Sequence, residues 1–250
     1  MQRTLTIPDL RRYAIARSLF ETESLGQAID RLGFVQADPI RAPARAQDLT
    51  LRHRVEGYRA GDLERRYEAL AIEEEYFVNY GFLPRRHVGL MHPRSPRREW
   101  DKPTRKLADR VLELVRERGQ VHPREVDEHF AHGTVKNYWG GSSNATTHLL
   151  DAMHYRGVLR VARREAGIRI YAPRQLPPRV AGAARKHEQA DALLALAVEL
   201  YAPIPRTTLG QLASRLRYSA PQLATELGAA LRRARAALRH AAVGDVEWYW

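Results

Sequence analysis

The chain contains no cysteine in its 250 residues. Without thiols it can form neither a disulfide scaffold nor a thiolate zinc site nor an iron–sulfur cluster. It also lacks a long apolar run: the most hydrophobic stretch, 192–198, is far shorter than the roughly 20 residues that span a bilayer. The first residues have no signal-peptide pattern. We therefore expect a cytoplasmic protein without a membrane partner.

Lysine is scarce, whereas arginine is abundant. Lys102, Lys106, Lys136 and Lys186 are the only lysines among 41 Lys+Arg residues, which face 29 Asp+Glu and give a net charge of +12. A coding bias accounts for much of the arginine-to-lysine ratio, but the excess charge favours a polyanionic partner, nucleic acid foremost. With 44% hydrophobic and 28% charged residues the chain is typical of a globular protein.

The N-terminal part begins with two predicted helices, over 8–20 and from Ser24 to Gly33, where glycine suits a helix end. Segment 34–39, Phe-Val-Gln-Ala-Asp-Pro, follows. Proline disfavours the helical conformation for the residue before it, so the segment should be extended. In extended chain alternate residues share a face, which places Gln36 and Asp38 together with the leading phenylalanine. Their neighbours at 35 and 37 should face the core.

The middle of the chain predicts a winged helix after a cationic connector at 85–106. Helices are expected at 107–118, 123–130 and 143–156, followed by a strand–turn–strand pattern over 158–171. In such a unit the third helix enters a DNA groove and the hairpin contacts the backbone.

The pattern repeats towards the C-terminus, with helices at 193–201, 207–216 and 221–240. Residues 243–250 predict the first strand of another wing whose partner strand is missing, so the chain looks like a fragment or one completed from outside. The fold class is therefore predicted as mainly α with small β wings, in tandem winged-helix domains. The predicted domains are 1–100, 101–178 and 186–250.

A Gln-apolar-Asp triplet lies at the centre of Leu-Gly-Phe-Val-Gln-Ala-Asp-Pro-Ile, residues 32–40. It resembles the catalytic motif of the YcaQ/AlkZ family of winged-helix DNA glycosylases, a similarity that runs the whole length of the chain. That family also tends to have the residue types found here at Arg45, Arg54, Tyr58 and Tyr138-Trp139.

The resemblance implies a DNA repair glycosylase that removes alkylated purines, with interstrand-crosslink unhooking in one branch. It also implies Gln36 and Asp38 as catalytic residues, and double-stranded DNA with alkylated bases or crosslinks as the partner. We expect a nucleoid-associated monomer without a cofactor. Two departures stand out. Val78-Asn79-Tyr80-Gly81 replaces a His-Glu-Ala stretch before Phe-Leu-Pro, and a C-terminal β-rich portion is lacking.

The chemistry of an alkylated purine suits these two side chains. The base carries a positive charge and leaves as a neutral molecule, so the enzyme mainly has to stabilise the charge that develops on the sugar. Asp38 would stabilise an oxocarbenium-like transition state and accept a proton from water, which the Gln36 amide would hold. No lysine lies near Asp38 in the sequence to form a Schiff base, which favours a monofunctional hydrolase. The alternative for Asp38 is a plain helix N-cap before proline.

Arginines in three places are candidate DNA contacts, although each could equally be a solvated surface residue. They are Arg41, Arg45, Arg52 and Arg54 on a predicted polar helix, Arg85 and Arg86 in the connector, and Arg163 and Arg164 at the wing tip. His122, His129 and His132 invite a zinc site, but no acidic ligand at helical spacing completes one, so we expect no metal. The rival functions are a non-enzymatic winged-helix regulator and a scaffold module that adds a strand to a partner.

Overall fold

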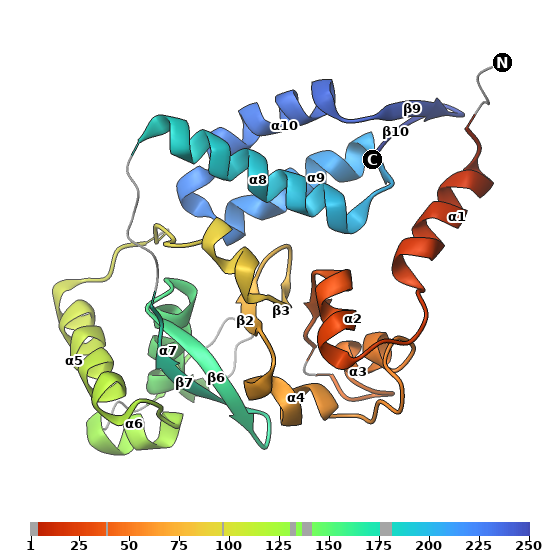
Figure 1. Cartoon of the computed structure of the whole chain (residues 1–250). Coiled ribbons are helices and arrows are strands. Elements are labelled where there is room, and N and C mark those ends of the chain that lie inside the picture. The colour runs from red at the N-terminus through yellow and green to blue at the C-terminus, as the bar shows by residue number, and fades with distance from the viewer. Residues whose placement is uncertain (1–4, 39, 97, 131–133, 137–141, 176–181) are drawn as a thin grey trace.

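The protein is described by a computed structural model that covers residues 5–38, 40–96, 98–130, 134–136, 142–175 and 182–250 (Figure 1). It is mainly helical, with short antiparallel strands, which confirms the predicted mainly α class with small β elements. No helix within the described ranges is long and apolar enough to cross a bilayer. Pro39, His132 and the Tyr138-Trp139 pair lie outside these ranges.

The N-terminal part begins with two capped helices, as predicted. Thr6 and Asp9 form a capping box for the first, Ser24 and Gln27 for the second, which ends at Gly33 with a φ of 66°. Antiparallel strands in the order β1-β3-β2 follow. The elements are α1 (Ile7–Ser18), α2 (Leu25–Leu32), β1 (Val35–Gln36), α3 (Ala46–Leu51), α4 (Asp62–Arg66), η1 (Tyr67–Ala69), β2 (Ile72–Tyr76), β3 (Tyr80–Pro84) and η2 (Arg85–Leu90).

The prediction of one polar helix that carries Arg41, Arg45, Arg52 and Arg54 is wrong. Only α3 is helical there, and Arg45 before it is extended. Pro43 lies in this stretch, lacks a backbone donor and keeps the preceding residue out of the helical region. The chain therefore leaves β1 through a loop that runs to Arg45.

The middle part has the predicted order of three helices and a hairpin. Its first helix begins five residues earlier than expected, because Asp101 accepts a hydrogen bond from the Thr104 amide at 2.9 Å and caps it. Ala166 and Gly167 both have positive φ, as a tight hairpin turn requires. The elements are α5 (Lys102–Arg118), α6 (Pro123–Phe130), β4 (Thr134–Lys136), β5 (Ser142–Asn144), α7 (Ala145–Tyr155), β6 (Leu159–Glu165) and β7 (Ile168–Pro173).

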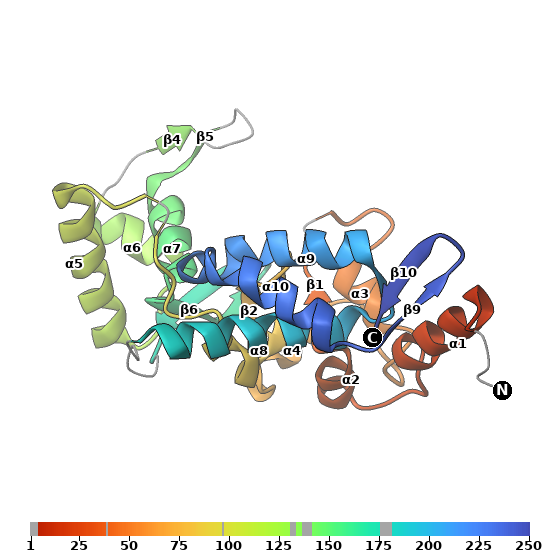
Figure 2. The ribbon, with the colours of Figure 1, turned by 90° about the horizontal axis from the view of Figure 1, so that it is seen from above.

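The C-terminal part corrects the expectation of a missing strand. The long helix ends at Ala237, and the next residue, Leu238, is extended. A further strand forms and pairs with the last one across Gly244, whose φ of 62° suits the turn, so both strands of the hairpin lie in the chain (Figure 2). The elements are α8 (Ala183–Tyr201), β8 (Ile204–Pro205), α9 (Arg206–Ser219), η3 (Pro221–Leu223), α10 (Glu226–Ala237), β9 (His240–Val243) and β10 (Val246–Tyr249).

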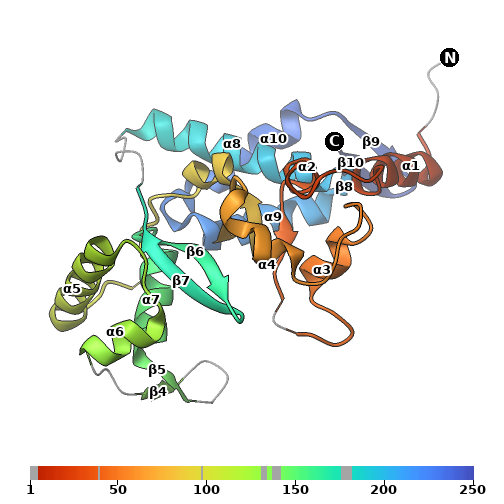
Figure 3. The same ribbon diagram turned by 60° about the horizontal axis from the view of Figure 1, so that its bottom comes forward.

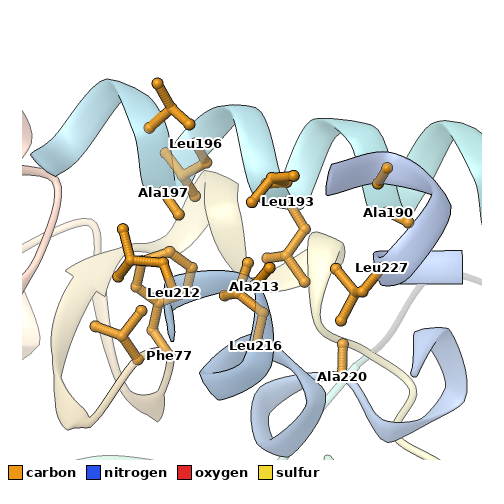
Figure 4. Packing of buried hydrophobic residues seen from close by; sticks show 14 of the residues in the cluster. Phe77, Ala190, Leu193, Leu196, Ala197, Leu212, Ala213, Leu216, Ala220 and Leu227 are labelled. Carbon is orange, nitrogen blue, oxygen red and sulfur yellow. The ribbon is translucent and has the colours of Figure 1, made fainter. Parts of the chain in front are cut away.

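Three hydrophobic clusters support the fold. One lies in the N-terminal part, one in the middle part, and the third joins α8, α9 and α10 to the β2–β3 hairpin. Phe77 from this hairpin packs among leucines of α8 and α9 in the third cluster (Figure 4). Phe82, on the same hairpin, belongs to the N-terminal cluster. The β2–β3 hairpin is therefore fixed on both sides, which gives β1 a rigid strand to pair with.

Candidate functional site

Segment 34–38 contains strand β1 at Val35–Gln36, and its side chains alternate as predicted. Val35 is 1% exposed and Ala37 packs against the same N-terminal cluster, whereas Gln36 is exposed and Asp38 is half-buried. The Phe34 side chain packs away from Val35, against the third cluster, which α8, α9 and α10 form with the β2–β3 hairpin. The two polar side chains of the predicted motif thus share the face that does not enter the N-terminal core.

Pairing with β3 holds this segment in place. Gln36 lies opposite Gly81, and the Ala37 amide donates to the Tyr80 carbonyl at 3.0 Å. A Cβ at Gly81 would stand 2.6 Å from Cζ of Phe34. Glycine is therefore needed at this point for the strands to approach so closely, and it leaves no side chain opposite Gln36.

Asp38 ends the strand with a side-chain-capped turn. Its Oδ1 accepts a hydrogen bond from the Ile40 amide at 2.8 Å, and its own amide donates to Oε1 of the buried Gln47 at 3.2 Å. The helix N-cap alternative is wrong, because the next helix begins only at Ala46. Among the described residues nothing donates to Oδ2 of Asp38 or bonds the Gln36 amide. Both groups are available to a ligand.

A cleft of about 600 Å³ lies between the loop 41–45 that follows this segment, α4, and the tip of the β6–β7 hairpin, and neither Gln36 nor Asp38 lines it. Figure 3 shows this hairpin pointing towards the loop that leads to α3. The guanidinium groups of Arg45 and Arg41 come within 3.7 and 3.8 Å of where a side chain on Gly167 would begin. The charged residues that line the cleft are Arg41, Arg45, Arg65, Arg164, Asp48 and Glu64. Positive charge exceeds negative charge there by two.

The side chains of Arg45, Arg54 and Tyr58 form contacts within the protein. Arg45 is ion-paired with Glu64. The Tyr58 hydroxyl donates to Oδ1 of Asp48 at 2.8 Å, and burial together with that carboxylate raises the pKa of Tyr58. Arg54 donates to the carbonyls of Ser18 and Thr50, each at 2.6 Å.

A row of buried carboxylates on β2 was not anticipated from the sequence. Glu73, Glu74 and Glu75 are each at most 4% exposed. Arg164 donates two hydrogen bonds to the carboxylate of Glu74, at 2.6 and 2.7 Å. Burial alone would raise the pKa of Glu74, but the bonds and charge of Arg164 outweigh it and lower that pKa. The signal in the sequence was the three consecutive glutamates inside an otherwise apolar strand.

Arg164 therefore holds the hairpin tip against β2. Its Nη1 also donates to the Gly167 carbonyl at 2.8 Å. The other predicted wing-tip residue, Arg163, bonds Gln120 and Glu165. Of the connector pair, Arg85 bonds Glu73 at 3.1 Å and Arg86 pairs with Asp30. Within the described part of the chain, Arg41 and Arg52 are the only predicted contacts whose side chains form neither a hydrogen bond nor an ion pair, since Arg54 donates to backbone carbonyls.

Arg94, which the sequence placed in the cationic connector, is 3% exposed. Its Nη1 donates to Oε1 of Glu75 at 2.8 Å and to the Tyr155 carbonyl at 2.9 Å, and Nη2 donates to the Tyr76 carbonyl at 2.7 Å. Its Nε donates to the Ser219 carbonyl. This single side chain therefore joins β2, the end of α7 and the end of α9.

His92 completes this buried network, with its Nε2 at 2.7 Å from Oε2 of Glu75 and its Nδ1 buried without a partner among the described residues. Burial lowers the pKa of His92 to about 4. Burial alone would raise the pKa of Glu75, but the charge of Arg94 and the bond from His92 hold it well below its usual range. In the folded protein the imidazole of His92 is thus neutral at pH 7, whereas the carboxylate of Glu75 is ionised.

The pKa of His92 predicts a pH-dependent stability. An unfolded histidine titrates near pH 6.5, so between about pH 6.5 and 4 the unfolded chain binds a proton that the native chain does not. The free energy of unfolding should fall across this window as the pH is lowered, by up to roughly 1.4 kcal/mol per pH unit from this group. Urea unfolding at pH 7, 6 and 5 measures this. In His92→Gln the free energy of unfolding should change less steeply with pH than in the wild type, by a slope equivalent to about one proton. An unchanged dependence would contradict the assignment.

Two of the histidines considered as metal ligands, His122 and His129, have other contacts, and His132 lies outside the described residues. The His122 ring accepts a hydrogen bond from the Arg124 amide at 3.0 Å, and His129 packs edge-on against Phe130. No group of three potential ligands occurs in the described ranges. The stretch Val78–Gly81, which replaces the His-Glu-Ala of the resemblance, has structural contacts: Val78 is buried in the third cluster, and Oδ1 of Asn79 accepts a hydrogen bond from the Tyr80 amide.

A family model described as "DNA glycosylase AlkZ-like" matches residues 29–250. The chain belongs to the AlkZ-like DNA glycosylase family. No curated protein and no solved structure matches it. The matched range contains Gln36, Asp38 and every residue of the arginine-lined cleft, whereas α1 precedes it. Membership of a DNA glycosylase family implies that this AlkZ-like protein binds DNA and acts in DNA repair.

Proposed function

We propose that this AlkZ-like protein is a monofunctional glycosylase that hydrolyses the N-glycosidic bond of N7- or N3-alkylated purines in duplex DNA. The observation that carries the proposal is the pair of open polar groups on segment 36–38. One oxygen of Asp38 is held by the Ile40 amide, which fixes the carboxylate, while the other takes no hydrogen bond from the described residues. The Gln36 amide is equally open and lies on the same face.

In the proposed reaction Asp38 acts on the sugar and not on the leaving base. The C1′–N bond breaks, its electron pair goes to the cationic base, and the base departs neutral. The free Oδ2 of Asp38 stabilises the positive charge that develops on the sugar and takes a proton as water adds to C1′. The Gln36 amide, which both donates and accepts, orients that water. Because the stretch Val78–Gly81 contains no histidine or glutamate, these two side chains carry the chemistry.

The DNA is proposed to lie across tandem winged-helix units that correspond to 1–100, 101–178 and 186–250. Helix, helix, helix and hairpin occur in this order in the middle part, and the β9–β10 hairpin follows three helical segments in the C-terminal part. The arginine-lined cleft, which begins at Arg41 in the loop after segment 36–38, would receive a backbone phosphate. Arg41 is best placed for this contact, because it is exposed and is not engaged by a described carboxylate.

The direct test is release of free base from duplexes that carry N7-methylguanine, N3-methyladenine or an interstrand crosslink. Wild-type protein should release the methylated bases and leave an abasic site without cutting the strand. Strand cleavage through a covalent enzyme intermediate would contradict the monofunctional assignment. DNA binding without release of any base would favour the rival, a winged-helix regulator.

Arg41→Gln should weaken duplex binding at every sequence, because a phosphate contact carries no base information. The slope of log affinity against log salt should become shallower by about one. Fluorescence anisotropy between low and physiological salt measures both. Arg11→Gln, an exposed arginine on α1 outside the matched range, is the matched control and should leave the slope unchanged. Equal slopes for Arg41→Gln and wild type would remove Arg41 from the interface.

A further inference from the structure

Ile40 is 65% exposed, the largest exposed fraction among the large hydrophobic side chains in the described ranges. Single exposed apolar residues are common and need no explanation by themselves. The position of Ile40 is what matters. It lies two residues after Asp38 in the sequence and precedes Arg41, so an exposed aliphatic side chain lies in the chain between a carboxylate and a cation.

Asp38 fixes where Ile40 stands. Its Oδ1 accepts the Ile40 amide hydrogen bond at 2.8 Å, so the carboxylate proposed to act on the sugar also sets the backbone of Ile40. Two residues of chain cover at most about 7 Å. The apolar side chain is therefore held within one nucleotide of the proposed reaction centre. Isoleucine is branched at Cβ and has few rotamers, so its shape is defined even without packing.

We infer that Ile40 is a wedge that enters the base stack and occupies the gap left when the alkylated nucleotide turns out of the duplex. This inference rests on the proposed function. An enzyme that acts on a base in duplex DNA must overcome stacking and pairing to reach it, and apolar side chains placed between base steps lower that cost. A gap one base thick is about 3.4 Å deep along a strand, which an isoleucine side chain fills.

The charges around Ile40 support the same role. Arg41 lines the cleft proposed to hold a phosphate, and it neighbours Ile40 in the chain. A strand anchored there by its backbone would present its bases to the adjoining residue. Ile40 has no polar atom to offer the sugar or the base, so it acts through shape alone. It is a positioning residue, and its effect should depend on whether there is a stack to open.

The test compares two duplexes with N7-methylguanine, one paired to cytosine and one opposite a tetrahydrofuran abasic analogue, where pairing is already lost. Ile40→Ala should release base from the paired duplex about tenfold more slowly or worse, because unstacking costs a few kcal/mol. On the unpaired duplex the rate of base release by Ile40→Ala should fall much less. Ile40→Leu should retain most activity on both. Ile15→Ala is the matched control, an isoleucine 53% exposed on α1, and should behave as wild type.

A binding readout separates this inference from the proposed function. With 2-aminopurine placed beside the lesion, addition of Asp38→Asn protein should raise the fluorescence as the stack opens, and the Asp38→Asn/Ile40→Ala double variant should not. Equal fluorescence, or an equal loss of rate on both duplexes, would overturn the wedge. If the wild type releases no base from either duplex, the proposed function fails, and the fluorescence alone then decides the role of Ile40.

Discussion

Asp38→Asn should lower release of N7-methylguanine from duplex DNA by roughly 100- to 10,000-fold, the range typical of losing a general base. The substitution removes the negative charge that Oδ2 offers to the developing oxocarbenium ion and to the attacking water. It keeps Oδ1 as an acceptor for the Ile40 amide, so the turn is preserved. Because the side chain is only half-buried, the melting temperature should change little.

Asp101→Asn is the matched control for this loss. Asp101 also caps a backbone amide, that of Thr104 at 2.9 Å, but it does so at the start of α5, outside the candidate site. Its substitution should leave base release unchanged. The catalytic assignment fails if Asp38→Asn releases base at the wild-type rate. A loss of rate accompanied by an equal loss of duplex affinity would instead make Asp38 a binding residue.

The local structure around the site was predictable because short-range rules decide it. Capping boxes at Thr6 and Ser24 and the glycine at 33 set the helices. Two-residue alternation correctly turned Val35 and Ala37 to the core and left the side chains of Gln36 and Asp38 on the other face. Each of these features depends on neighbours within a few residues, which the sequence displays directly.

The partners of the arginines could not be predicted, because they depend on residues far away in the chain. Arg164 and Glu74 are 90 residues apart, and Arg94 and Ser219 are 125 apart. From the sequence, Arg94 and Arg164 looked like surface cations that could meet phosphates. In the fold both are bound to buried carboxylates, so the net charge of +12 overstates the positive surface available to DNA.

The missed β9 strand has a different cause. The predicted helix 221–240 extends past the observed end of α10 at Ala237 and includes His240, the first residue of β9, because alanines and arginines continue the helical pattern. The predicted strand 243–250 includes only the last residue of β9. Pairing with β10 overrides that local preference, and Gly244 provides the turn. Helix propensity is a weak guide where a neighbouring strand supplies hydrogen bonds.

Arg94→Met should destabilise the protein by about 3–5 kcal/mol, the usual loss when one partner of a buried ion pair is removed. The guanidinium has 0% side-chain exposure and Glu75 has 1%. Methionine fills similar space but leaves three carbonyls without a donor and Glu75 without its closest cation. For a chain of this size the melting temperature should fall by roughly 6–20 °C. Thermal and urea unfolding at pH 7 measure the effect.

The matched control is Arg105→Met, whose ion pair with Glu99 is more than half exposed on both sides, and it should change stability by no more than about 0.5 kcal/mol. The double variant Glu75→Gln/Arg94→Met should recover part of the loss, because the stranded carboxylate charge is gone. A loss below about 1 kcal/mol for Arg94→Met would show that Arg174, 3.0 Å from Glu75, suffices to hold that carboxylate. The join of β2 to α7 and α9 would then rest on packing alone.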